Sequence, residues 1–230
     1  MTVEPHEFWQ EILPEKYSNS PPYNTHYPSK LKDGSVLMLP IRSLGATNNG
    51  LASLILNQAS FAVENILAKF LVELIKADKP DVVVGIPTLG LSLAREVSLL
   101  LGHKRYIPLG TSRKFWYDER LSVSMSSITS PETKKRLYLD PRMEPLIKGR
   151  RVCLIDDVIS SGASIKSGMD LLEIVQVSPI SIGAAMLQSD KWRKMFNSIN
   201  PNMIPLIKGA IKSPLLKKRK DGWWPESIDY

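Results

Sequence analysis

The chain has 230 residues, with 43% hydrophobic and 23% charged residues, which is ordinary for a soluble globular protein. This length can bury a substantial core without disulfides or metal staples, and we expect a single domain over residues 1–230. No stretch approaches 18 uninterrupted apolar residues, so a membrane-spanning helix is excluded and no membrane partner is expected.

The compartment is indicated by the N-terminus and by the single cysteine. The first residues are acidic and lack the apolar segment of a secretory signal. Cys153 lies within an apolar run, which is typical of a buried thiol in a reducing compartment. We therefore expect a cytoplasmic protein.

The net charge of +7 would suit a nucleic-acid partner. Much of the excess, however, lies in residues 134–136 and 217–220, and such charge runs are usually solvated surface. A polyanionic small substrate would favour the same basic surface, so charge alone does not separate these classes. We expect no nucleic-acid partner.

The N-terminal part lacks the pattern of an alternating strand and helix array. Residues 1–35 are rich in proline and aromatic residues, which predicts irregular structure wrapped on a surface. Residues 36–41 and 51–56 are short apolar runs with the turn signal Asn-Asn-Gly at 48–50 between them. This pattern predicts a β-hairpin.

Strand and helix signals then alternate. Residues 60–76 carry an apolar stripe with helical spacing, and the apolar run 81–86 predicts a buried strand. A second helix is predicted at 91–101, closed by Gly102, and the next strand at 105–109. Further strands are expected at 137–139, 152–155, 179–187 and 203–207, and further helices at 162–176 and 190–196.

The most informative stretch follows the apolar residues 152–155. Asp156 and Asp157 come directly after them, and a small hydroxyl-rich turn then leads into a helix. The start of a helix has free N–H groups that suit a phosphate, and Gly162 lets the backbone approach it closely. Ionised carboxylates accept hydrogen bonds only, so the two acids suit the vicinal hydroxyls of a sugar. The predicted ligand therefore carries a phosphate and a ribose.

Two other segments have binding features. Residues 85–90, Gly-Ile-Pro-Thr-Leu-Gly, join a predicted strand to a predicted helix, which is a second and weaker anion-site pattern. Residues 112–136 have no sustained apolar period and are long for a loop in a compact domain. Such loops are usually functional lids or disordered segments.

Residues 152–164 resemble the PRPP-binding signature of the type I phosphoribosyltransferases, and the resemblance extends over roughly residues 80–187. It implies an α/β fold in which helices flank a mostly parallel sheet, with a small hood. It also implies transfer of the 5-phosphoribosyl group of PRPP to a nucleobase, with release of pyrophosphate. Mg²⁺ would be held on the substrate without direct protein ligands, and a homodimer would be expected.

Site roles follow from the resemblance. Asp156 and Asp157 would hold the ribose hydroxyls and stabilise positive charge on the ribose. Arg113 and Lys114 match the basic step that opens the mobile catalytic loop of adenine-type enzymes, and they would offset the charge of pyrophosphate. The ribose and 5-phosphate would contact Asp156, Asp157, Ile159, Ser160, Ser161, Gly162, Ala163 and Ser164, and pyrophosphate would contact Pro87, Thr88, Leu89 and Gly90.

Ser160 narrows the class of nucleobase that the resemblance implies as substrate. Enzymes for hypoxanthine and guanine carry a carboxylate at this position as a general base, so the sequence resembles adenine-, xanthine- or orotate-type members more closely, and we expect a purine. Glu119 and Glu132 lie in the predicted lid, but neither falls convincingly on the adenine-type glutamate. The identity of the acid/base group stays open.

Two further questions stay open. The core is expected at about residues 58–187, with 1–57 and 188–230 as hood or surface additions, and Trp223-Trp224 either stacks on the base or docks the tail. The alternative function is a non-catalytic PRPP-sensing regulator of the same fold. The absence of a helix-turn-helix pattern before residue 58 counts against it.

Overall fold

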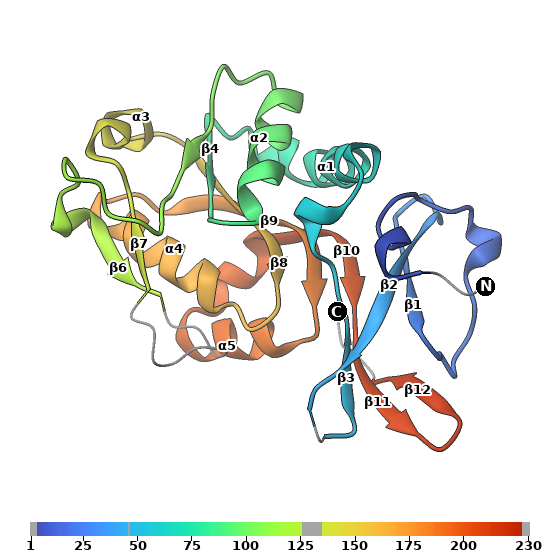
Figure 1. The fold of residues 1–230 in the computed structure, drawn as a ribbon. Helices are drawn as coiled ribbons and strands as arrows, with labels where there is room; N and C mark the ends of the chain where they lie inside the picture. Colours follow the sequence, from blue (N-terminus) through green and yellow to red (C-terminus); the bar gives the residue numbers. More distant parts are fainter. Residues whose placement is uncertain (1–3, 46, 126–134, 227–230) are drawn as a thin grey trace.

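The computed structural model describes residues 4–45, 47–125 and 135–226. Its centre is a five-stranded sheet in the order β10-β9-β8-β4-β5 (Figure 1), and every neighbouring pair in it is parallel. The strands are nearly continuous apolar runs because helices cover both faces. Their bounds are β4 (Val82–Gly85), β5 (Ile107–Pro108), β8 (Val152–Ile159), β9 (Pro179–Gln188) and β10 (Ile207–Ser213).

Alternate residues of β8 pack on opposite faces of this sheet. Cys153 and Ile155 belong to a buried cluster that also holds residues of α1 and α2, whereas Leu154 belongs to a second cluster with residues of α4 and α5. In Figure 1 the sheet accordingly runs between these two pairs of helices. The helices are α1 (Phe61–Ile75), α2 (Gly90–Leu100), α3 (Glu144–Ile147), α4 (Ala163–Ile174) and α5 (Lys191–Ile199).

A second five-stranded sheet, antiparallel in every neighbouring pair, has the order β1-β2-β3-β11-β12. It combines strands from both ends of the chain and lies beside the parallel sheet in Figure 1. A smaller hairpin, β6 with β7, packs near α4. The bounds are β1 (His26–Lys30), β2 (Val36–Ser43), β3 (Asn49–Ala52), β6 (Ser122–Ser124), β7 (Arg136–Tyr138), β11 (Leu215–Arg219) and β12 (Gly222–Pro225).

Most predicted elements are present. The hairpin is formed by β2 and β3, with Ile41 opposite Ala52, although β3 begins and ends earlier than the apolar run at 51–56. All four predicted helices form within a few residues of their expected bounds, and the strands after α1 form in the expected order as far as β9. The expected α/β class, a parallel sheet flanked by helices, is thereby confirmed.

Three predictions about elements were wrong. Residues 1–35 are not all irregular, because Pro28 lies in β1 opposite Met38. Residues 203–207 do not form a strand: Pro201–Leu206 is a 3-10 helix, and β10 begins only at Ile207. The predicted strand at 152–155 is too short, since β8 continues through both acids to Ile159.

Trp223 docks the C-terminal segment. It lies in β12, is 7% exposed, and belongs to the same buried cluster as Tyr23. The backbones of these two residues exchange hydrogen bonds, from Tyr23 N to Trp223 O (2.8 Å) and from Trp223 N to Tyr23 O (2.7 Å). Of the two interpretations of Trp223-Trp224, the structure favours docking for Trp223.

Within the described ranges, none of the helices has both the length and the apolar character needed to cross a bilayer.

Candidate functional site

The loops after β4 and β8 meet at one edge of the parallel sheet. The two strands are neighbours, and Ile86 N donates a hydrogen bond to Ile155 O (2.8 Å). A Cβ atom built on Gly90 would lie 2.8 Å from Cα and 2.9 Å from Oδ1 of Asp156. Residues 87–90 and the acidic pair, which are far apart in the sequence, are therefore in direct contact.

The acidic pair sits in a poorly solvated position. Asp156 is 5% exposed and Asp157 is half-buried, and Asp157 N donates to Asp156 Oδ1 (2.9 Å). Burial raises the pKa of Asp156, and the neighbouring Asp157 carboxylate raises it further; burial also raises the pKa of Asp157. Such a pair is stabilised by a ligand that brings hydroxyl donors or a cation.

The turn after β8 has the geometry of an anion loop. Gly162 has φ +85°, a left-handed conformation that glycine adopts without strain, and α4 begins at the next residue. Ser161 Oγ accepts a hydrogen bond from Ala163 N (3.3 Å). The remaining N–H groups of the first turn of α4 have no partner within the helix and suit a phosphate.

The same loop is supported from behind by α5. A Cβ atom on Gly162 would collide with Met195 and would lie 3.1 Å from the ring of Phe196. Trp192 N donates to Ser160 O (3.1 Å), so the start of α5 fixes the loop backbone. The sequence predicts a helix at this point, but its contact with the site was not predicted. The apolar residues Trp192 and Phe196, four apart, indicate a helix face that packs against another part of the chain.

The loop at 87–90 is short and partly exposed. The Pro87–Thr88 peptide bond is cis, and α2 starts at Gly90. Thr88 is exposed, whereas Gly90 is buried against β8. This loop therefore offers backbone groups and one hydroxyl beside the acidic pair.

Arg113 and Lys114 follow β5, whose carboxyl end lies at the same edge of the sheet, since Leu109 N donates to Gly85 O (3.0 Å). Both side chains are exposed. Arg113 Nε is 2.8 Å from Glu119 Oε1. Glu119, considered above as an acid/base group, is thus engaged with the guanidinium of Arg113.

The segment predicted as a lid is anchored at both sides. β6 and β7 pair across it, and Leu121 and Leu137 are buried in the cluster that holds residues of α4. Glu132 and the other residues at 126–134 lie outside the described residues.

The residues present fit a substrate-borne Mg²⁺. Within the described ranges no group of three or more His, Cys, Asp or Glu side chains could hold a metal by themselves. Mg²⁺ is commonly bound by one or two carboxylates together with substrate phosphates and water, and Asp156 with Asp157 offers such carboxylates.

Cys153 is buried, as predicted. Burial raises the pKa of its thiol to about 12, so the thiolate is not formed near neutral pH. His103 Nε2 lies 3.1 Å from Pro80 O, which agrees with a surface or capping role.

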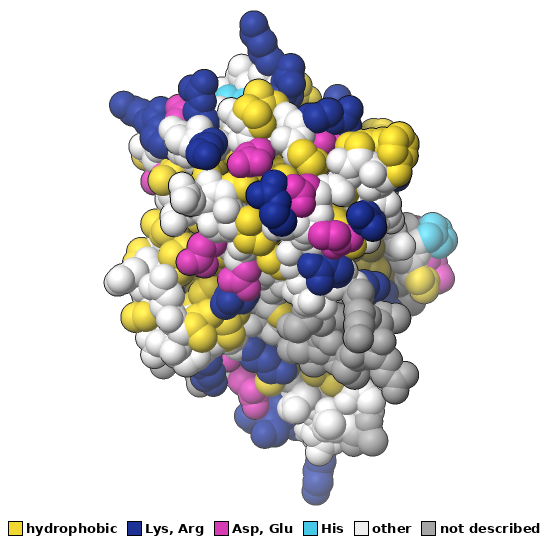
Figure 2. Space-filling model, turned by 90° about the vertical axis from the view of Figure 1, so that its left-hand side faces the viewer, with side chains coloured by type: hydrophobic (Ala, Val, Ile, Leu, Met, Phe, Trp, Pro, Cys, Tyr) yellow, Lys and Arg dark blue, Asp and Glu magenta, His cyan; other side chains and the backbone are white. Residues whose placement is uncertain are grey.

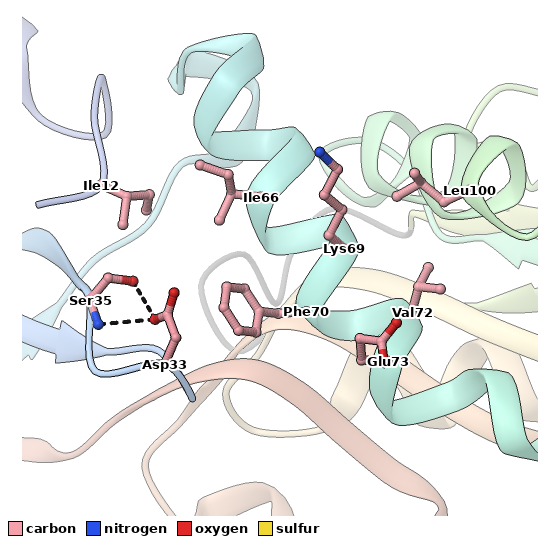
Figure 3. A pocket seen from close by; sticks show the side chains of 9 residues that line it. All are labelled: Ile12, Asp33, Ser35, Ile66, Lys69, Phe70, Val72, Glu73 and Leu100. Atoms are coloured by element: carbon pink, nitrogen blue, oxygen red, sulfur yellow. Dashed lines mark hydrogen bonds between the residues drawn. The ribbon is translucent and has the colours of Figure 1, made fainter. Parts of the chain in front are cut away.

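A groove of about 720 Å³ lies between α1 and the N-terminal segment. Figure 3 shows Phe70 and Ile66 of α1 directed toward Ile12 and toward Asp33, which accepts hydrogen bonds from Ser35. The residues that line it include none from the loops at 87–90 and 156–164. This groove is therefore separate from the candidate site.

Comparison with known proteins agrees with this arrangement. Residues 55–212 match the phosphoribosyl transferase domain family. A curated relative, the hypoxanthine/guanine phosphoribosyltransferase of Methanobrevibacter ruminantium, is 25% identical over 142 residues, which cover 62% of this chain and 71% of the relative.

Solved structures share the fold at lower identity. Adenine phosphoribosyltransferase from Thermoanaerobacter pseudethanolicus superposes with a TM-score of 0.54 at 18% identity, covering 66% of this chain and 81% of that one. The enzyme from Giardia lamblia, complexed with 9-deazaadenine, gives 0.53 at 18% identity, covering 66% and 80%. The family match spans most of the sequence, and the parallel sheet of this chain carries the expected loops. The chain therefore belongs to the phosphoribosyl transferase domain family.

Proposed function

We propose that this protein transfers the 5-phosphoribosyl group of PRPP to a purine base and releases pyrophosphate. The observation that supports this most is the contact between Gly90 and Asp156. PRPP carries its pyrophosphate on the ribose, so a loop for pyrophosphate must touch the residues that hold the ribose hydroxyls.

The 5-phosphate binds the loop between Ser160 and Ser164. Backbone N–H groups at the start of α4 and the serine hydroxyls donate to it, and Gly162 allows close approach. Ile159 and Ala163 complete this loop. Asp156 and Asp157 accept hydrogen bonds from the ribose hydroxyls, which compensates for the burial of their charges.

In the reaction the bond from the ribose anomeric carbon to pyrophosphate breaks, and the electron pair leaves with pyrophosphate. A bond from the same carbon to a base nitrogen forms, and the proton of that nitrogen passes to water or to the released pyrophosphate. The acidic pair stabilises positive charge on the ribose, while Pro87 to Gly90 hold pyrophosphate and Arg113 with Lys114 offset its charge. Asp156 and Asp157 would hold a substrate-borne Mg²⁺, which would supply positive charge to offset that of pyrophosphate.

Purines are the proposed base class because the named relatives act on them. The curated relative is named for hypoxanthine and guanine, and the solved structures are named for adenine. Ser160 cannot act as a general base near neutral pH, which favours adenine or xanthine as the base. We further propose that the antiparallel sheet, built from residues within 1–57 and 188–230, forms the hood.

A panel experiment tests this function. Purified protein with PRPP and Mg²⁺ is offered adenine, xanthine, hypoxanthine, guanine, uracil and orotate, and pyrophosphate release is measured. Release is expected with a purine, to be abolished by Asp156→Asn with Asp157→Asn and retained by Asp170→Asn on α4. PRPP binding without release for any base would refute the transfer and favour a PRPP-binding regulator.

A further inference from the structure

A second cavity lies along the outer side of α2, at its C-terminal half. Its volume is about 720 Å³, and it is bounded by α2, the connection from α2 to β5, and the segment after β5. In Figure 2, Lys and Arg side chains gather at the top of the molecule, at the height where Figure 1 draws this connection.

Three cations border the cavity: Arg95, Lys104 and Arg105. Within the described part of the chain, Lys104 and Arg105 have no ion-pair partner, and Arg95 has only a distant one, 3.8 Å from Glu96. Cations near the end of a helix offset its dipole, but this effect is confined to the last turn and does not account for Arg95. The cavity therefore presents positive charge that the described residues leave uncompensated.

The one acid of the lining is already neutralised. Asp140 accepts hydrogen bonds from Arg142 Nε (3.0 Å) and Nη2 (2.5 Å) and from Trp116 Nε1 (3.2 Å). These bonds keep the pKa of Asp140 well below its usual range. An anion in the cavity would not face an unpaired carboxylate there.

Two residues of the lining, Ser98 and His103, carry buried polar atoms. Ser98 is 2% exposed, and its Oγ has no hydrogen-bond partner among the described residues. His103 Nε2 bonds to Pro80 O, and its Nδ1 is likewise buried without a described partner. Both atoms are enclosed by protein, so they lie behind the cavity wall and are not counted among the groups that a ligand would contact.

The rest of the lining includes the rings of Tyr106 and Tyr117. Aromatic side chains bind planar rings by stacking or edge contacts. Cations and aromatic rings around one cavity are the complement of a molecule that carries both a phosphate and a flat ring.

We propose that this cavity binds a nucleoside phosphate, distinct from the substrates at the candidate active site. Its phosphates bind Lys104, Arg105 and Arg95, and its base lies against a tyrosine ring. The position along α2 separates it from the active site: Gly90 and Ser98 lie eight residues apart, about 12 Å along the helix.

The cavity is linked to the segment that carries the lid cations. Tyr117 N donates to Lys114 O (3.0 Å), and the ring of Tyr106 lies 3.6 Å from a Cβ atom built on Gly85, at the end of β4. A bound nucleotide therefore contacts the segment that carries Arg113, and also Tyr106, whose ring packs near the end of β4. We expect it to change the apparent KM for PRPP.

Calorimetric titration with ADP tests the site. The full chain is first saturated with PRPP and Mg²⁺ without a base, so that the active site is filled. One ADP per chain is expected to bind, with affinity falling at least tenfold in Lys104→Glu with Arg105→Glu. The matched control, Lys32→Glu with Lys220→Glu, changes the net charge equally at two exposed lysines and is expected to bind ADP as the wild type does.

Several outcomes would overturn the proposal. One is that the PRPP-saturated wild type binds no ADP, whether the cavity lacks affinity or a second copy of the chain covers it. Another is that Lys104→Glu with Arg105→Glu binds ADP as tightly as the wild type does. Inorganic pyrophosphate as the probe tests the ring contact: affinity equal to that of ADP, or no loss of ADP affinity in Tyr106→Leu with Tyr117→Leu, would refute it. PRPP binding is measured separately in the first step, so its failure counts against the proposed function and not against the cavity.

Discussion

Replacing Gly90 by alanine tests whether the contact between the two loops sets the geometry of the site. The added Cβ atom would lie 2.8 Å from Asp156 Cα and 3.1 Å from Asp156 C, well inside the roughly 3.5–4.0 Å at which carbon atoms pack. The opposing atoms belong to the backbone of the central strand β8, which is hydrogen-bonded on both sides, so the start of α2 must move instead.

Overpacking of this kind costs about 1–3 kcal/mol of folding stability. For a chain of this size each kcal/mol lowers Tm by about 2–4 °C. A shift approaching 1 Å between residues 87–90 and the acidic pair would lower kcat/KM by about a hundredfold. Gly110→Ala is the matched control, because it also follows a parallel strand and its Cβ atom would meet nothing closer than 3.8 Å.

The assays are thermal unfolding and steady-state pyrophosphate release with the preferred base of the panel. Gly90→Ala is expected to lose more kcat/KM than Gly110→Ala even at a temperature where both variants are folded. Equal PRPP affinity and equal kcat/KM in the two variants would refute the argument that this contact positions the substrate.

Three other changes give distinct results. Asp156→Asn with Asp157→Asn should weaken PRPP binding yet raise Tm, because removing buried like charges relieves a cost of the folded state; a lower Tm would contradict this. Since the pKa of the pair is raised, its cost to stability should grow as pH rises from the ordinary carboxyl pKa to the raised one, level off above it and vanish in the variant, while wild-type PRPP affinity falls as pH drops through the raised pKa. Glu119→Gln should cost less than about 1 kcal/mol, because its ion pair is half-exposed, but should alter KM for PRPP by releasing Arg113; an unchanged KM would show that this pair does not restrain Arg113. Trp223→Ala should cost about 3–5 kcal/mol with the preference among bases unchanged, and a changed preference would place its ring at the base.

The alternating core could be predicted because burial on both faces makes each strand a short apolar run. The runs at 82–85 and 179–188 are of this kind, and the helices between them carry apolar stripes. Strands outside the parallel sheet were harder to predict. Lys217 and Arg219 are exposed, as the charge run predicts, but that they lie in β11 was not predicted, because pairing with β3 and β12 decides their conformation.

The candidate site also has features that the sequence predicts and features that it does not. The turn chemistry of Gly162 and the acidic pair can be read locally, so the loop was found in the sequence. The extension of β8 through Asp156 could not be predicted locally, since it depends on pairing with Ala184 of β9. The support of the loop by Met195 depends on packing between segments more than thirty residues apart.

The pairing of β3 with β11 has a consequence for biosynthesis. These strands lie side by side in the antiparallel sheet, but about 160 residues separate them in the chain. At roughly 5–20 residues per second, ribosomal synthesis takes about 8–30 s to cover that distance. During this interval β3 is an unpaired edge, the kind of surface that recruits foreign strands. The nascent chain is therefore prone to aggregation until β11 has been synthesised and pairs with β3.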